Sequence, residues 1–452
     1  MSFWWLGFIA VVDWLSASSV FGASQVLALN LKDCESRSLQ NSERVQQTEL
    51  ELSAQQFKVD STRSNLWPRL SFDASYRYLS VVPSIAQPKG AALALGDNHN
   101  YSIGPVLNWM VFDFGATQSA AQAQQVLFNA KNEELRNARR QSLLGVRLAF
   151  YRVSSALEQQ ALVTDSLKLA QSQYRDIKNR SQAGSSSRID LLASHREVLS
   201  LEGTFREVQT ELSNAALDLL RQTNDSRTEF DFSRPLRSSL VHGLPDNLAT
   251  PSVLIEAQKP SELSQLVTEA EVKVANHPGV VAMKLQAESL ELMSNSIHSG
   301  LYPKVQVQLK SSFDYPNGPA LERVQQNTVS VGLSVPLFEF SRSRNEASEK
   351  SQLALALQTR TQSLEKDYER DLEKVRIQLR TLESQKETLS TLSEEATQLA
   401  SLIYSAYQNG RSSFLEVQSA NLRVLDARVQ LARNQVQILV SRAQLQSLVN
   451  EK

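Results

Sequence analysis

The chain contains two copies of one arrangement of segments. The stretch "LWPRLSFDASYRY" (Leu66 to Tyr78) aligns with "LYPKVQVQLKSSF" (Leu301 to Phe313) at an offset of 235 residues, from 66 to 301. Further along, "PVLNWMVFDFG" aligns with "VGLSVPLFEFS", and "QAGSSS" with "QNGRSS", at 226 residues, from 182 to 408. The offset changes only across one loop, residues 80–100 against 316–326. A length change in a single loop, with register kept on both sides, predicts a duplicated unit.

Each copy has room for very long helices. No proline occurs from Val106 to Arg234 or from Leu337 to Lys452, and proline is the residue that breaks helix interiors. A helix over 116–181 would extend about 100 Å at about 1.5 Å per residue. Helices over 33–64 and 187–222 would each be about half as long and would fit end to end along it. The second copy repeats this pattern, with helices expected over 342–408 and 413–450.

The returning helices carry apolar residues at heptad spacing, which is typical of coiled-coil seams. In the first copy these residues are Val198, Leu201, Phe205, Val208, Leu212, Ala215 and Leu219, and in the second they are Leu422, Leu425, Val429, Ala432, Val436, Leu439 and Ala443.

Four segments alternate between apolar and polar residues, which is the signal of β-strands. They cover approximately 66–79, 101–114, 301–315 and 327–340 and are long enough to cross a bilayer when tilted. Lipid does not tolerate an open sheet edge, and four strands are too few for a barrel, so several copies would have to share one. The polar positions expected to line its lumen are Arg69, Asp73, Arg77, Lys304, Gln306, Gln308 and Lys310. A soluble sheet with one solvated face has the same alternation.

Composition restricts the remaining classes. The 47 basic and 48 acidic residues leave a net charge of −1, which provides no electrostatic basis for binding nucleic acid. The mean hydropathy of −0.30 is too polar for a bundle of membrane helices. The apolar N-terminus predicts a signal peptide over residues 1–23, and the proline-containing segment 224–260 is interpreted as a connector between units at 24–223 and 261–452.

No pattern of catalytic or metal-binding residues is present in the sequence. The five histidines are scattered without an HExxH pair, and there is no glycine-rich phosphate loop or G-x-S-x-G motif. We therefore expect neither an enzyme nor a cofactor or metal site.

The two polar turns have the residues of a helical hairpin tip. Gly184 and Gly410 suit the left-handed conformation that ends a helix. Ser187 and Ser413 each precede an acid by three residues, Asp190 and Glu416, which is the spacing of a helix N-cap. Each turn would lie about 100 Å from the strands.

The order helix, strand, strand ending "FDFG", long helix, G-x-S-S-x-x-D turn and returning helix, given twice, resembles the TolC-type outer membrane factors of the outer membrane efflux protein family. The resemblance covers nearly the whole chain after residue 23. It implies a mixed α/β membrane protein and a homotrimer. Four strands from each protomer would share a barrel in outer-membrane lipid, and this barrel would continue as a long periplasmic α-helical barrel.

The resemblance also implies a function, partners and a gate. The protein would be the exit duct of a tripartite efflux pump or a type I secretion system, with a periplasmic adaptor and an inner-membrane transporter of the RND, ABC or MFS class. Its periplasmic gate would involve Asp190, Glu416 and Tyr407, with Arg411 or Arg188 as basic partner because Ser412 stands where that partner is usual. In the alternative interpretation the two acids only cap their helices.

One other function remains open at this level. A periplasmic coiled-coil scaffold or surface-structure protein without a channel would also carry the heptads. It would not explain four membrane-length strands at matched positions of the two copies.

Overall fold

The computed structural model describes residues 27–85, 93–224, 237–238, 253–255 and 274–449. The expected signal peptide at 1–23 lies outside the described residues, as does most of the expected connector at 224–260.

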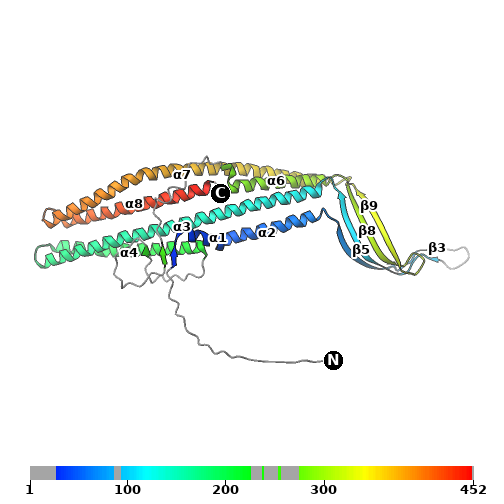
Figure 1. Ribbon diagram of the computed structural model, residues 1–452, viewed down its shortest axis with the longest axis horizontal. Coiled ribbons are helices and arrows are strands. Elements are labelled where there is room, and N and C mark those ends of the chain that lie inside the picture. Colours follow the sequence, from blue (N-terminus) through cyan, green and yellow to red (C-terminus); the bar gives the residue numbers. More distant parts are fainter. Residues whose placement is uncertain (1–26, 86–92, 225–236, 239–252, 256–273, 450–452) are drawn as a thin grey trace, which may run out of the picture.

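The chain forms an elongated body with helices along most of its length and a four-stranded sheet at one end (Figure 1). The elements of the first half are α1 (Leu31–Asn41), α2 (Glu43–Ser64), β2 (Arg69–Tyr78), β5 (His99–Phe112), α3 (Ala116–Gln182) and α4 (Arg188–Thr223). Those of the second half are α6 (Pro278–Ser299), β8 (Lys304–Tyr315), β9 (Val324–Ser334), α7 (Arg342–Gln408) and α8 (Phe414–Leu448). Short elements are β1 (Leu27–Leu29), β3 (Ser84–Ile85), β4 (Leu93–Ala94), β6 (Arg237–Ser238), β7 (Val253–Ile255) and the 3-10 turn η2 (Val274–Asn276).

Two helices of equal length set the length of the helical body. Helices α3 and α7 have 67 residues each, or about 100 Å. Helices α2 and α4 lie along α3, and α6 and α8 lie along α7, so that each long helix is accompanied by two shorter ones (Figure 1). The helix that the sequence predicts as continuous over 33–64 is divided, because Ser42 is extended (φ −63°, ψ 116°) and its hydroxyl accepts from the amide of Val45 at 3.5 Å.

Helix α6 is joined to both long helices by hydrogen bonds from its serine side chains to their backbone carbonyls. Ser289 Oγ donates to the carbonyl of Ala123 on α3 at 2.8 Å, and Ser294 Oγ donates to the carbonyl of Ala347 on α7 at 2.8 Å. Ala123 and Ala347 are buried, and their small side chains allow the helices to come this near.

The main core lies where α1, α3, α4 and α8 meet. Its largest buried side chains include Phe150, Val153 and Leu212, and Cys34 is buried among them. Burial raises the pKa of the Cys34 thiol to about 12, which makes it unreactive at neutral pH. The heptad positions of α4 are buried except for the half-buried Phe205. In α8 the pattern is looser, and Leu422 is 52% exposed because it lines a groove between the two hairpins.

The sheet has the strand order β2-β5-β8-β9, and all neighbours are antiparallel. Strand β5 pairs with β8 across the two halves of the chain, with an irregularity between Met110 and Phe112. Strands β2 and β9 are the two edges. The last strand ends at Ser334 and not near residue 340 as predicted. Pro336 cannot donate to the ladder, and Phe340 and Ser341 have φ of 46° and 63°.

The strand-to-helix junctions use an acid in each half. Asp113 accepts from the amides of Gly115 (3.1 Å) and Thr117 (2.8 Å) at the start of α3. Glu339 accepts from Ser343 Oγ at 2.5 Å at the start of α7. Carboxylates at these positions satisfy free backbone or hydroxyl donors near the helix N-terminus.

The sequence gives no sign of the small parallel sheet β1-β7-β6, in which Leu27 pairs with Val253 and Arg237 with Leu254. Strands of two or three residues are too short to show a period.

Candidate functional site

The first hairpin tip joins α3 to α4. Gly184 has a φ of +76°, as expected for the residue that ends a helix in the left-handed conformation. Ser187 is the N-cap of α4, and its hydroxyl accepts from the amide of Asp190 at 3.0 Å. Within the described chain the Asp190 carboxylate makes no return bond to the cap.

The second tip joins α7 to α8 and has a complete capping box. Gly410 has a φ of +72°. Ser413 Oγ accepts from the amide of Glu416 at 3.3 Å, and the Glu416 carboxylate accepts from the amide of Ser413 at 3.3 Å. Ser412 Oγ also donates to this carboxylate. The two hydrogen bonds that the Glu416 carboxylate accepts lower its pKa below the ordinary value, and the bond from the Ser412 hydroxyl contributes more than the bond from the Ser413 amide.

One polar contact and one apolar cluster connect the two tips. Tyr407 OH lies 3.5 Å from Ser186 Oγ of the first tip. Phe414 is buried, packs edge-on against the Tyr407 ring with centroids 5.6 Å apart, and belongs to a cluster with Ile177 and Val417. The expected partners Arg188 and Arg411 are exposed, and no ion pair joins either to Asp190 or Glu416 in the described chain. The structure therefore brings Tyr407 and Ser186 together, and Glu416 with the serines of its own turn.

The sheet places every charged residue of its strands on one face. Strands β5 and β9 contain no Asp, Glu, Lys or Arg. The six on β2 and β8 are Arg69, Asp73, Arg77, Lys304, Lys310 and Asp314. Arg69 pairs with Asn108, and Asn108 pairs with Gln308; since alternate residues share a face, this register puts all six on the same side, with Gln306 and Gln308. Gln308 Nε2 donates to Asn108 Oδ1 at 2.9 Å on this face.

The opposite face of the sheet is apolar and exposed. Leu70, Phe72, Val329 and Val331 lie on it, with 68% to 72% of each side chain accessible. In the described chain no element other than the strands themselves packs against it. An exposed apolar surface of this extent marks contact with lipid or with another protein.

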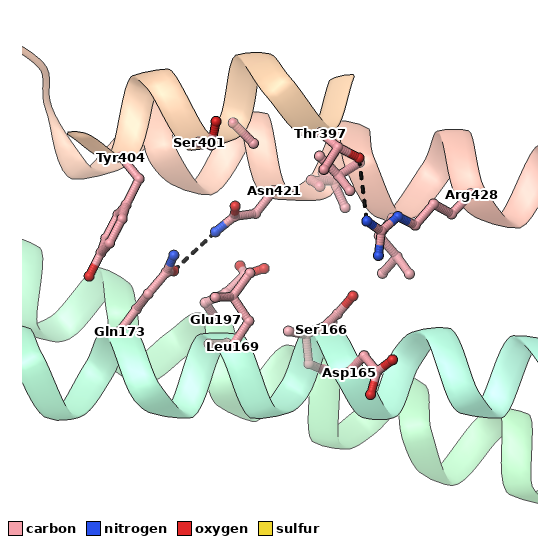
Figure 2. Close-up of a pocket in the computed structure, with 16 residues that line it drawn as sticks. Asp165, Ser166, Leu169, Gln173, Glu197, Thr397, Ser401, Tyr404, Asn421 and Arg428 are labelled. Carbon is pink, nitrogen blue, oxygen red and sulfur yellow. Dashed lines mark hydrogen bonds between the residues drawn. The ribbon is translucent and has the colours of Figure 1, made fainter. Parts of the chain in front are cut away.

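A groove of about 340 Å³ lies between the two hairpins, near the tips, and sequence reasoning did not find it. In Figure 2, Asn421 and Gln173 point toward one another across it, and Asn421 Nδ2 donates to Gln173 Oε1 at 3.0 Å. Tyr404 OH donates to Asp176 at 3.3 Å between the same hairpins. These residues are 248 and 228 positions apart, and no local pattern connects them.

Among the described helices, none has an apolar stretch long enough to span a bilayer. The described residues also contain no group of three or more His, Cys, Asp or Glu side chains that could hold a metal ion.

A model of the outer membrane efflux protein family matches residues 35–224 and 273–451, which is most of the chain. The chain therefore belongs to this family, which is one of channels and not of enzymes, and the identification from the sequence is confirmed. The comparison with curated proteins gives no match.

Several solved structures have the same fold. CusC is 13% identical with a TM-score of 0.76, and the match covers 94% of each chain. The CmeC outer membrane channel of Campylobacter jejuni is 12% identical with a TM-score of 0.74, covering 92% of this chain and 85% of CmeC. VceC, an outer membrane protein of Vibrio cholerae, is 16% identical with a TM-score of 0.73, covering 92% and 95%. At these identities the likeness concerns the fold.

Proposed function

We propose that the protein is the outer-membrane exit duct of a tripartite efflux or type I secretion system, assembled as a homotrimer. Three copies would pair β9 of one with β2 of the next and close a barrel of twelve strands in the outer membrane. The helices would continue this barrel across the periplasm, with the hairpin tips at the far end.

The two-faced sheet is the observation that carries this proposal. Its apolar face has no covering element in the described chain, and its edge strands, β2 and β9, each pair with a strand on one side only. Closure with further copies would satisfy the edge groups, as lipid requires. The apolar face would then contact lipid and the charged face would line the lumen. In a coiled-coil scaffold surrounded by water, the apolar face and the edge strands of this sheet would remain exposed, so this observation favours the channel.

The helical part supports the second half of the duct. The tips lie at the opposite end from the sheet (Figure 1), about 100 Å away along α3 and α7. A periplasmic adaptor and an inner-membrane transporter of the RND, ABC or MFS class would meet the duct at this end. We further propose that Asp190, Glu416 and Tyr407 take part in closing it there.

Neighbouring positions on β9 provide a matched test. Val329 is on the apolar face and is 72% exposed, whereas Thr328 pairs with Lys310 on the charged face. A lysine facing lipid near the membrane midplane costs about 2–4 kcal/mol, and a lysine in a water-filled lumen does not incur this cost. Val329→Lys should therefore abolish or strongly reduce the trimer in outer-membrane fractions, while Thr328→Lys should leave it intact.

Single-particle imaging of the purified parent completes the test. We expect a threefold tube longer than about 100 Å. A monomeric particle, or equal tolerance of the two lysine substitutions, would contradict the proposal.

A further inference from the structure

The charged residues on the polar face of the sheet are arranged in order along the strands. Arg69 and Lys304 begin β2 and β8, directly after α2 and α6, and Lys310 lies six residues after Lys304, or about 20 Å along the strand. Because Arg69 is level with Gln308 through Asn108, it lies between the two lysines. The half of the face nearest the helices therefore has three cations and no carboxylate.

The two carboxylates occupy the next rows toward the loops. Asp73 pairs with Gly104, and the Gly104 backbone lies against Ser311 and Ser312. Asp314 pairs with Ser102. Arg77 follows at the level of Asn100. The whole face carries four cations and two carboxylates, which leaves a formal charge of +2 in each copy.

A hydrogen-bonded bridge marks the boundary between the two zones. Ser102 Oγ accepts from Lys310 Nζ at 2.9 Å and donates to Asp314 Oδ1 at 2.6 Å. The hydroxyl stands between the ammonium and the carboxylate, so this pair does not form a direct ion pair. Lys310 is half-buried, and its hydrogen bond to Ser102 keeps the ammonium group at one position along the strands.

We propose that Arg69, Lys304 and Lys310 form a basic belt in the barrel lumen that selects anions, including organic carboxylates and sulfonates, over cations of the same size. This inference rests on the proposed trimeric duct, in which three copies bring nine cations to one segment of the lumen. Rings of Lys and Arg raise the local concentration of anions and exclude cations in pores. The acidic rows of Asp73 and Asp314 oppose this preference beyond the belt.

Reversal potentials of single channels in a KCl gradient test the belt. To remove the contribution of the tips, the recordings use Asp190→Asn with Glu416→Gln as background. Neutralising two of the three belt residues with Arg69→Gln and Lys310→Gln should lower the chloride-to-potassium permeability ratio several-fold. The charge-conserving pair Arg69→Lys and Lys310→Arg should retain the ratio, and Asp73→Asn with Asp314→Asn should raise it. Replacing chloride by benzenesulfonate should give the same order of variants.

The outcomes separate the belt from the duct. Equal permeability ratios for the neutral and charge-conserving pairs, in intact conducting trimers, would overturn the belt and leave the duct standing. A parent that forms no conducting trimer would overturn the proposed function, and the belt with it. A change in ratio that the charge-conserving pair shares would assign the effect to packing and would also overturn the belt.

Discussion

The two hairpin tips share a sequence pattern but are held by different contacts. Both have a left-handed glycine and a serine N-cap. At the second tip the residue after the cap is Phe414, which is 2% exposed and packs against Ile177 of the first hairpin. At the first tip the matching position is Arg188, which is exposed and is followed by the 79% exposed Ile189. The first residue of α8 thus anchors the second tip to its neighbour, while the first two residues of α4 are exposed and its contact with the same cluster begins only at Leu191.

The acids differ in the same way. Glu416 is engaged by Ser412 and by the amide of Ser413, whereas the Asp190 carboxylate has no bond to its own cap. A carboxylate already bonded within its turn has less capacity to bind a neighbouring hairpin. Asp190 is therefore the better candidate for a link between subunits, and Glu416 the better candidate for a structural role.

The largest expected difference between the tips concerns apolar anchoring. Phe414→Ala removes a buried aromatic side chain and should destabilise the tip region by about 3–5 kcal/mol. Ile189→Ala, at the exposed start of α4, should change stability by less than about 0.5 kcal/mol. Hydrogen exchange of the amides in the last turns of α3 and α7 measures both effects. Similar losses of protection in the two variants would show that the anchoring is not confined to the second tip.

The next effect concerns the caps. Ser187→Ala and Ser413→Ala should each cost about 1 kcal/mol of local helix stability. The loss should be larger for Ser413→Ala, because the bond from the Ser413 amide to the Glu416 carboxylate is made in the same turn and is weakened when the turn loosens. Exchange rates of the amides of Asp190 and Glu416, the cap-bound donors, give the readout, and Ser187→Thr with Ser413→Thr serve as controls that retain a hydroxyl. A larger loss at Ser187 would reverse the ranking of the tips.

Gating should depend more on the first tip than on the second. If the tip carboxylates of three copies ring a narrow mouth, they attract cations. We expect Asp190→Asn to reduce cation selectivity and raise open probability, and Glu416→Gln to add a smaller change. Tyr407→Phe should raise opening without altering selectivity, because it removes the hydroxyl near Ser186 but no charge. Single-channel recording of the three variants beside the parent distinguishes these outcomes, and unchanged selectivity in the Asp190→Asn, Glu416→Gln double variant would leave only the capping roles.

The smallest expected effect is a difference in pH dependence. The pKa of Glu416 is lowered by its bonds to Ser412 and Ser413 from the ordinary value of 4.5. The stabilisation from these bonds is present above pH 4.5 and is lost as the pH falls through the lowered pKa. At the first tip the cap acceptor is the Ser187 hydroxyl, which does not titrate. The protection factors of the amides at the start of α8, which are corrected for the slowing of intrinsic exchange in acid, should therefore fall below pH 4.5 more than those at the start of α4. Glu416→Gln should remove the difference.

The turn chemistry of the candidate gate could be predicted because it is local. Gly184, Ser187, Gly410 and Ser413 act within three or four residues of the chain, so their spacing alone specifies the left-handed turn and the cap. The contact between Tyr407 and Ser186 joins residues 221 positions apart. No local rule indicates that it connects the two tips, or that Phe414 packs against Ile177 of the other hairpin.

The sequence by itself determined the long helices, the four strands and the face of each strand that carries charge, because proline placement and residue period act along one segment. Only the tertiary structure decided how the segments align. The register of β2, β5 and β8 places Arg69 between Lys304 and Lys310 and both Asp73 and Asp314 beyond them. The early end of β9 and the break at Ser42 were also set by backbone geometry. The physical reason is that period and propensity specify which way a side chain faces, whereas its neighbours across strands and hairpins depend on hydrogen-bond register and packing between distant parts of the chain.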